Sequence, residues 1–307
     1  MSDDLEAWLS AERSRVEEAL LRVVGAASGS IGGRAAEPGR ALAAAARYAI
    51  AAGGKRLRPI LCVAGYRAIG GAPPEPVYRL AASLELIHTY SLIHDDLPSM
   101  DDDDVRRGRP STHIAHGVAT ATLAGAALIP LAVRVAREAA GDLPLAPGVP
   151  MELVVTLCRA AGGGGMVGGQ LLDLEAEGRA VSLAELERIH RLKTGALLTA
   201  APLMGGMAAG ARGVARDALR VYGSALGLAF QVADDILDVT GSSAVLGKRA
   251  GRDTELEKAT FPALEGLDAA RRRAAAEAET AVAALDAAAV ASKELRALAR
   301  YAVERDR

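Results

Sequence analysis

The sequence predicts an all-α protein, for three reasons. Half of the 307 residues are apolar, but only 3% are aromatic. Alanine and glycine are abundant, whereas the β-branched and aromatic runs that favour strands are scarce. Apolar residues recur at helical spacing, and we find no alternating pattern of a half-buried strand. We therefore expect closely packed helices.

Short segments rich in glycine and proline separate these helices. The segments are GAASGSIGG (25–33), GGAPPEP (70–76), GDLPLAPGVP (141–150) and AGGGGMVGGQ (161–170). The helices then cover about 3–25, 38–52, 57–70, 76–97, 111–140, 149–166, 182–208, 213–239 and 268–306, the last with a possible break. None of the breakers is long enough for a linker, so we expect one domain over residues 1–307. The glycines of 161–169 lack the GK[ST] ending of a P-loop and predict close helix packing or a kink.

Charge and hydropathy argue against nucleic-acid binding, a signal peptide and a membrane span. The net charge of −2 gives no basic excess that would point to nucleic acid. The N-terminus is acidic and amphipathic, unlike a signal peptide. The charge-free stretch from Pro110 to Val133 is better explained as a helix in the middle of a bundle than as a membrane span. Cys62 and Cys158 have no metal-site spacing, so we expect two buried thiols and a cytoplasmic protein.

The segment HDDLPSMDDDDVRRGRP (94–110) concentrates opposite charges. Six of the ten residues from Asp95 to Asp104 are aspartate, and three arginines follow. Pro98 disfavours an undistorted helix here, so we expect the helix to end near Leu97 and the chain to bring Asp101 back towards Asp95. Such a cluster needs cations to offset its repulsion.

A second aspartate cluster, FQVADDILDVTG (230–241), lies on a predicted helix. Asp234 and Asp238 are four residues apart, which places both carboxylates on one face. Oxygen ligands of this kind suit Mg²⁺, which is usually held by one or two carboxylates together with substrate phosphates and water.

Basic residues accompany the two acidic clusters. In GGKRLRP (53–59), Lys55 and Arg58 lie at a helix start, where anions bind favourably. In RLKTGALL (191–198), Lys193 lies in an apolar helix, where it needs an anion. Lys248 and Lys258 follow the second cluster. Each is a weak signal alone, but together they predict a pocket for a diphosphate with a hydrocarbon tail.

These motifs resemble the polyprenyl (isoprenyl) diphosphate synthases, and most closely the bacterial farnesyl diphosphate synthases. The resemblance covers nearly the whole chain and includes GGQLLDLEAEG (168–178) and LGKRAGRD (246–253). It implies an antiparallel helical bundle around one deep central cavity, and usually a homodimer. It also implies a prenyltransferase that joins an allylic diphosphate to isopentenyl diphosphate, with three Mg²⁺ ions, which Mn²⁺ can replace.

The resemblance also implies roles for individual residues. Asp95, Asp101, Asp234 and Asp238 would bind metal. Arg106, Lys193, Thr194, Gln231, Lys248 and Lys258 would form the allylic site, where Lys193, Thr194, Gln231 and Arg106 act in catalysis. Gly54, Lys55, Arg58, His88 and Arg107 would form the isopentenyl diphosphate site. Tyr90 and Ser91 would limit product length, and a tyrosine there is typical of a C15 product.

Alternatives remain open from the sequence. A C20 synthase differs only in product length. A non-catalytic regulatory subunit of the same family is suggested by Val118, Ala126 and Pro130, which depart from the family pattern. A terpene cyclase usually lacks GGKRLRP, and a metal-dependent phosphohydrolase would need further metal-spaced histidines.

Overall fold

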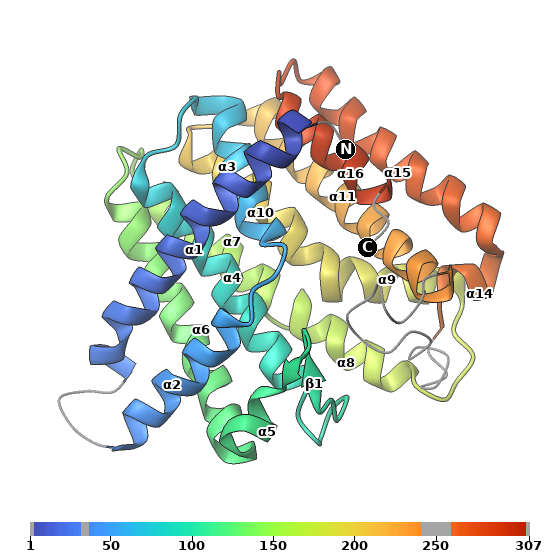
Figure 1. Cartoon of the computed structure of the whole chain (residues 1–307). Coiled ribbons are helices and arrows are strands. Elements are labelled where there is room, and N and C mark those ends of the chain that lie inside the picture. The colour runs from blue at the N-terminus through green and yellow to red at the C-terminus, as the bar shows by residue number, and fades with distance from the viewer. Residues whose placement is uncertain (1–2, 32–36, 241–258, 305–307) are drawn as a thin grey trace. The chain divides into compact units, whose positions relative to one another are not determined.

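The computed structural model describes residues 3–31, 37–240 and 259–304 (Figure 1). Almost all of its regular structure is helical, which confirms the predicted all-α class. The contacts of the chain divide it into two compact units. The first comprises residues 1–5, 61–73 and 155–307, and the second comprises residues 6–60 and 74–154. The expectation of one domain over residues 1–307 stays a prediction.

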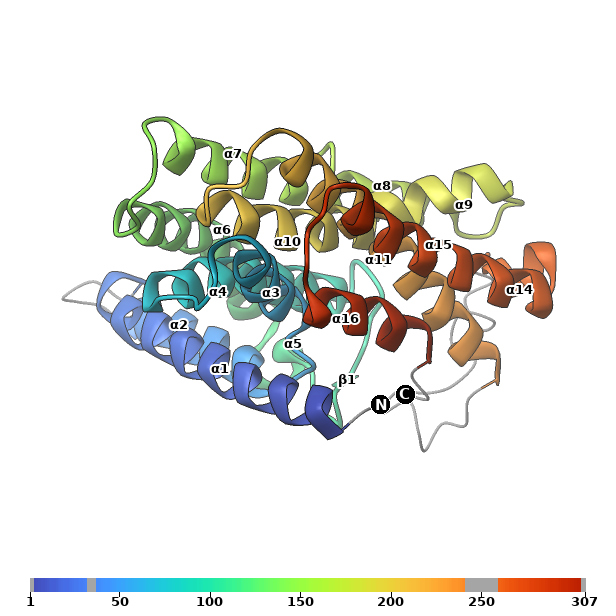
Figure 2. The ribbon, with the colours of Figure 1, turned by 90° about the horizontal axis from the view of Figure 1, so that it is seen from above.

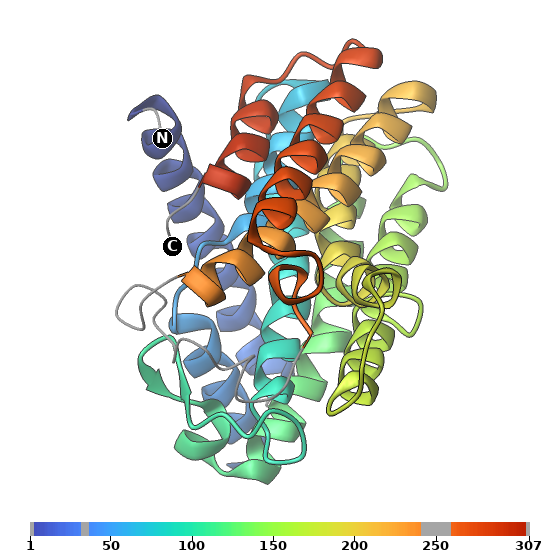
Figure 3. The same ribbon diagram turned by 90° about the vertical axis from the view of Figure 1, so that its right-hand side faces the viewer.

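The second unit is built around a buried helix. It holds most of α1 (Asp3–Ile31), α2 (Glu37–Ala51), α4 (Glu75–Asp95), α5 (Thr112–His116), α6 (Val118–Gly141) and a hairpin of β1 (Val105–Arg106) and β2 (Arg109–Pro110). Helix α4 is buried on most of its surface and packs against α6 and α2. Figure 3 shows the hairpin and α5 beyond the C-terminal end of α4.

The first unit is arranged around α11. It holds α8 (Met166–Ala176), α9 (Leu183–His190), the π-helical turn η1 (Arg191–Gly195), α10 (Ala196–Ala208), α11 (Gly213–Thr240), α14 (Phe261–Glu265), α15 (Leu267–Ala287) and α16 (Lys293–Glu304). Helices α3 (Leu57–Gly70) and α7 (Val149–Ala161) have residues in both units. Helix α11 packs along α10 and α15 (Figure 2), and Val232, Phe261 and Ala270 lie in its apolar core.

Several predicted elements need correction. The helix predicted over 111–140 is divided at Gly117, whose φ of 81° ends α5. The helix predicted over 182–208 contains η1. The break expected within 268–306 is confirmed and lies between α15 and α16. Helix α8 and the β1–β2 hairpin were not predicted. Pro130 lies inside α6, as the sequence pattern indicates.

One described helix, α6, is long and apolar enough to span a membrane by length and composition alone. Its most apolar window is 39% buried inside the protein. The buried face of α6 packs against α4, α2 and α5 of the same unit. This packing agrees with the expectation of a bundle helix, although part of the apolar surface stays exposed.

Candidate active site

The first aspartate motif begins where α4 ends. The helix ends at Asp95, and the chain turns back within six residues. The N–H of Asp101 donates to the carbonyl of Asp95 over 2.9 Å, and the N–H of Asp103 donates to the carbonyl of Asp96 over 3.2 Å. The turn therefore brings Asp101 back beside Asp95, as Pro98 predicts.

Arg106 lies in the β1–β2 hairpin and is held by two carboxylates. Its Nε donates to Oδ1 of Asp96 over 2.9 Å, and its Nη2 bonds to the same oxygen. Nη2 also lies 3.3 Å from Oδ2 of Asp103. Asp96 is only 2% exposed, so this ion pair is partly buried and fixes the guanidinium. Sequence reasoning missed Asp96, because adjacent aspartates cannot be told apart without the turn.

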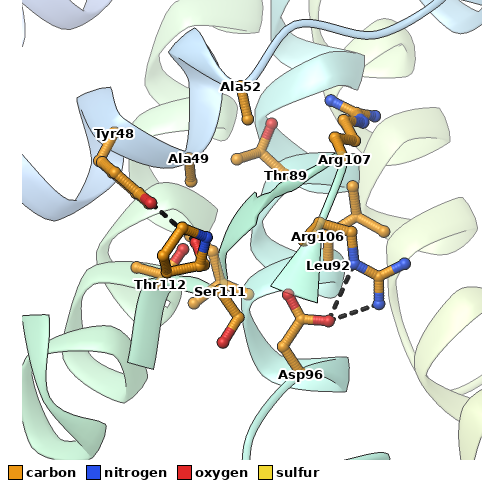
Figure 4. Close-up of a pocket in the computed structure, with 12 residues that line it drawn as sticks. Tyr48, Ala49, Ala52, Thr89, Leu92, Asp96, Arg106, Arg107, Ser111 and Thr112 are labelled. Atoms are coloured by element: carbon orange, nitrogen blue, oxygen red, sulfur yellow. Dashed lines mark hydrogen bonds and ion pairs between the residues drawn. The ribbon is translucent and has the colours of Figure 1, made fainter. Parts of the chain in front are cut away.

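A pocket beside this ion pair is lined by α2, α4 and the hairpin (Figure 4). Tyr48 of α2 donates its hydroxyl proton to the carbonyl of Pro110 over 2.8 Å, which ties the hairpin to α2. The guanidinium of Arg109 lies 4.4 Å from the centre of the Tyr48 ring. Figure 4 shows Arg106 turned towards Asp96 and Arg107 turned away from it.

Arg107 is placed against the turn between α2 and α3. Its Nη1 donates to the carbonyl of Gly53. A Cβ atom on Gly54, whose φ is 136°, would lie 2.7 Å from the Arg107 guanidinium carbon. Gly54 is therefore needed for its backbone conformation, and a side chain there would displace the Arg107 guanidinium. The structure brings these two residues together, although they are 53 positions apart in the sequence.

Arg56 anchors the basic turn, which is the segment GGKRLRP (53–59) after α2. Its Nη1 donates to Oε1 of Glu85 over 2.7 Å, and its Nη2 donates to the carbonyl of Ile50 over 2.6 Å. Both side chains of the Arg56–Glu85 pair are 3% exposed. The pair links the turn that carries Lys55 and Arg58 to α4, one helical turn before His88. Sequence reasoning missed this pair as well.

His88 lies among the arginines of the second unit. Burial lowers its pKa well below the usual value, and Arg58, Arg107, Arg106 and Arg56 lower it further. The imidazole is therefore neutral at pH 7, and it can donate a hydrogen bond to an anion. The convergence of these positive charges makes a strong local attraction for polyanions.

Tyr90 and Ser91 lie on the same helix. The Tyr90 and His94 rings meet edge to face with centres 5.0 Å apart, and the pKa of Tyr90 is raised by burial and by Asp95. Nε2 of His94 lies 3.0 Å from the carbonyl oxygen of Thr122 on α6. The hydroxyl of Ser91 donates to the carbonyl of His88 over 2.9 Å. Tyr90 is thus positioned by a histidine that is itself fixed.

The second aspartate motif lies near the end of α11 in the first unit. Asp238 is 8% exposed, and within the described part of the chain its Oδ1 is buried with no hydrogen-bond partner. Asp234 is half-buried four residues earlier. Asp235 lies between them, but its oxygens accept bonds from Gln231 and from the N–H of Phe261. The three carboxylates therefore have different environments.

Lys193 and Thr194 lie in η1, where the helix widens. Nζ of Lys193 donates to Oδ2 of Asp173 over 2.6 Å, and Oγ1 of Thr194 donates to Oε1 of Gln231 over 3.0 Å. A Cβ atom on Gly169 would lie 2.1 Å from the backbone nitrogen of Lys193. The glycine allows α8 to approach η1, as the glycine-rich segment predicts. π-Helical turns are frequent at functional sites.

The predicted ligands Lys248 and Lys258 lie outside the described residues. Those in the described ranges fall into two sets. Arg106, Arg107, Gly54, Lys55, Arg58, His88, Asp95 and Asp101 lie in the second unit, and Lys193, Thr194, Gln231, Asp234 and Asp238 lie in the first.

Residues 40–299 match the family model described as polyprenyl synthetase. The chain belongs to the polyprenyl synthetase family. Within this family, it is 47% identical to farnesyl diphosphate synthase from Escherichia coli, over 85% of this chain and 88% of that one. It is 45% identical to a chloroplastic geranylgeranyl pyrophosphate synthase from Capsicum annuum, over 75% of this chain and 62% of that one.

A solved family structure has a similar fold. The structure of a FPP/GFPP synthase from Zymomonas mobilis matches with a TM-score of 0.83 and 36% identity, over 99% of this chain and all of that one. Membership confirms the predicted prenyltransferase class. It also sets aside the terpene cyclase and the phosphohydrolase.

The family uses divalent metal ions. Within residues 3–31, 37–240 and 259–304, no three histidine, cysteine or carboxylate side chains form a metal cluster by themselves. Mg²⁺ at a phosphate site needs only one or two carboxylates, because phosphates and water complete its coordination. The buried Oδ1 of Asp238 fits this role, because an unpaired buried carboxylate oxygen is costly without a cation.

Proposed function

We propose that this enzyme adds isopentenyl diphosphate to geranyl diphosphate once, or to dimethylallyl diphosphate twice in succession, and releases farnesyl diphosphate, with one pyrophosphate formed at each addition. The observation that carries this proposal is the convergence of Arg58 and Arg107 on a neutral His88. These residues are distant in the sequence and are three of the predicted isopentenyl diphosphate ligands. The similarity to farnesyl diphosphate synthases supports the C15 product.

In the proposed reaction, the second unit holds isopentenyl diphosphate. Lys55, Arg58 and Arg107 would bind its phosphate oxygens, and His88 would donate one hydrogen bond without adding charge. The buried Arg56–Glu85 pair keeps the turn in place. The turn then needs little ordering when isopentenyl diphosphate binds. The bound diphosphate holds the double bond of the substrate in a fixed orientation.

The allylic diphosphate ionises by cleavage of its C–O bond. Arg106 and Lys193 would stabilise the pyrophosphate as its charge develops, together with Lys248 and Lys258. Three Mg²⁺ ions, which Mn²⁺ can replace, would supply Lewis-acid stabilisation when bound through Asp95, Asp101, Asp234 and Asp238.

The allylic cation is stabilised by oxygen dipoles. The Thr194 hydroxyl donates its proton to Gln231, so the lone pairs of its oxygen can face positive charge. The double bond of isopentenyl diphosphate attacks C1 of the cation and forms the new C–C bond. This attack moves the positive charge to the isopentenyl unit. The carbon next to that charge then loses a proton to the released pyrophosphate, and a new double bond forms. Charge and atoms balance without an additional reagent.

We also propose a cytoplasmic homodimer that neither inserts into membranes nor binds nucleic acid. The charge-free face of α6 supports the dimer, because Val118, Leu123 and Ile129 are 49%, 58% and 36% exposed on it. A second copy of the chain would remove this apolar surface from water. Light scattering should give twice the 31.5 kDa chain mass, and Leu123→Asp should reduce it to the monomer.

Product analysis tests the reaction. The purified protein is incubated with Mg²⁺, isopentenyl diphosphate and one primer: dimethylallyl, geranyl or farnesyl diphosphate. Mass spectrometry of the dephosphorylated alcohols should give farnesol from the two shorter primers, with farnesyl diphosphate left unextended. Geranylgeraniol would instead identify a C20 synthase. No elongation from any primer would reject catalysis and favour a regulatory subunit.

A further inference from the structure

The central carboxylate of the second aspartate motif differs from Asp238 in its hydrogen bonds. Asp235 lies four residues after Gln231, so the two side chains lie on one face of α11, one turn apart. Asp235 is 3% exposed. Its Oδ1 accepts a bond from Nε2 of Gln231 over 3.1 Å, and its Oδ2 accepts one from the N–H of Phe261 over 3.0 Å.

His190 completes the surroundings of this carboxylate. Its Nε2 lies 3.4 Å from Oδ2 of Asp235, and its ring stacks on Phe261 with centres 5.5 Å apart. Asp235 therefore joins three elements of the first unit, α9, α11 and α14. Both of its oxygens are used by these neighbours, in contrast to the buried Oδ1 of Asp238.

The bonds also have a direction. A carboxylate only accepts, so it fixes the NH₂ group of Gln231 towards Asp235 and the amide oxygen towards Thr194. Thr194 must then donate its single hydroxyl proton to Gln231. Thr194 thus donates to Gln231, and Gln231 donates to Asp235. The lone pairs of the Thr194 oxygen are left for a cation.

We propose that Asp235 is a positioning residue, which orients Gln231 and Thr194 for catalysis and is not a metal ligand. An acceptor at position 235 forces Thr194 to act as a donor to Gln231. An asparagine at that position could donate instead. The Gln231 amide could then flip and present its NH₂ group to Thr194, so that Thr194 would accept this hydrogen bond rather than donate it. The inference rests on the proposed prenyl transfer, because Thr194 and Gln231 act there on the cation.

An exchange of groups tests the proposal. In Asp235→Asn, the asparagine oxygen can still accept from Phe261, but its NH₂ faces Gln231. In Gln231→Glu, two carboxylates oppose each other and neither can donate. In the double variant Gln231→Glu/Asp235→Asn, the new amide donates to the new carboxylate, and Thr194 donates as before. Total charge equals that of the wild type.

We expect each single variant to reduce kcat about tenfold or more, and the double variant to recover most of that loss. The Mg²⁺ concentration for half-maximal activity should stay within about twofold in Asp235→Asn but rise about tenfold or more in Asp238→Asn. A similar rise in Asp235→Asn would identify a metal ligand and overturn the proposal. A double variant no better than Gln231→Glu would overturn it too.

Urea unfolding of the wild type, the two single variants at Asp235 and Gln231, and their double variant provides a readout that does not depend on catalysis. The two substitutions should show a clear coupling, with the double variant more stable than the sum of the single effects predicts. Additive effects would contradict the proposed link even if the wild type proves inactive. Absence of product from the wild type together with coupled stabilities would reject the proposed function but keep the link from Asp235 to Gln231. If a single variant does not fold, the double variant decides. A double variant that folds supports the link, and one that does not fold counts against it.

Discussion

Arg106 and Arg107 are consecutive residues, but their guanidinium groups have different partners. Arg106 is bound by Asp96 and Asp103, whereas Arg107 turns away and bonds to the carbonyl of Gly53 in the basic turn (Figure 4). A short hairpin produces this separation, because Arg106 ends β1 whereas Arg107 lies in the turn that follows, where its backbone has a positive φ of 54°. One segment can thus present a cation to each of two anions.

The first prediction follows from this divergence. Arg106→Lys should raise KM for the allylic diphosphate about tenfold or more while KM for isopentenyl diphosphate changes little, because lysine loses the bidentate guanidinium. Arg107→Lys should have the reverse selectivity. Steady-state kinetics with each substrate varied in turn measure both constants. Equal effects of each variant on both substrates would show that the two arginines serve a single anion.

The second prediction concerns Asp96, which holds Arg106 and is not one of the proposed metal ligands. Asp96→Asn should raise KM for the allylic diphosphate about tenfold and lower the free energy of unfolding by about 1–3 kcal/mol, because a charged hydrogen bond is lost. Its Mg²⁺ dependence should match the wild type. Asp102→Asn is the matched control, because Asp102 is exposed and an asparagine tolerates its φ of 50°. A strongly increased Mg²⁺ requirement in Asp96→Asn would count against the positioning role.

The third prediction is a pH dependence of stability caused by His88. Its pKa is lowered in the folded protein, whereas the unfolded chain titrates near the usual 6.5. Below pH 6.5 His88 therefore binds a proton in the unfolded state but not in the folded state, so the free energy of unfolding falls as the pH falls. Urea midpoints between pH 7.5 and 5.0 should fall less steeply in His88→Gln than in the wild type. Parallel curves would exclude His88 as the cause.

The fourth prediction concerns product length. Tyr90 lies five residues before Asp95, about 7.5 Å along an ideal helix. Tyr90→Ala should remove the ring that limits the hydrocarbon chain, so geranylgeraniol should appear among the dephosphorylated products. Tyr90→Phe keeps the edge contact with His94 and should still give farnesol. If the alanine variant also yields only farnesol, Tyr90 is not the limit.

Much of the fold could be predicted from the sequence because glycine and proline mark the ends of helices. The exceptions have physical reasons. Helix α8 contains Gly168 and Gly169, whose low helix propensity argues against a helix. The close approach of Gly169 to the backbone of Lys193 explains why glycine is used there. The π-helical turn has no sequence pattern of its own, because its extra residue is accommodated by packing against α8 and α11.

The candidate site was predicted less completely. Residue types and spacing indicated the basic turn, Lys193 and the two aspartate clusters, and the family resemblance implied His88. The partners of the aspartates could not be predicted, because nothing in the sequence distinguishes Asp96 or Asp235 from the aspartates beside it. Their roles follow from the partners that tertiary structure brings to them, Arg106 for one and Gln231 for the other.

The last prediction tests the contact that shapes the π-helical turn. A Cβ atom on Gly169 would lie 2.1 Å from the backbone nitrogen and 2.5 Å from the Cα atom of Lys193, and a backbone cannot move aside like a flexible side chain. Gly169→Ala should therefore displace η1, with a loss of about 1–3 kcal/mol in the free energy of unfolding. It should also reduce kcat by up to about a hundredfold, because Lys193 and Thr194 move with the turn. Gly164→Ala is the control, since a Cβ atom there meets nothing within 4 Å, and it should change stability by less than about 0.5 kcal/mol. Urea unfolding and single-turnover kinetics compare the two variants, and equal behaviour would show that the approach of α8 to η1 does not position the catalytic residues.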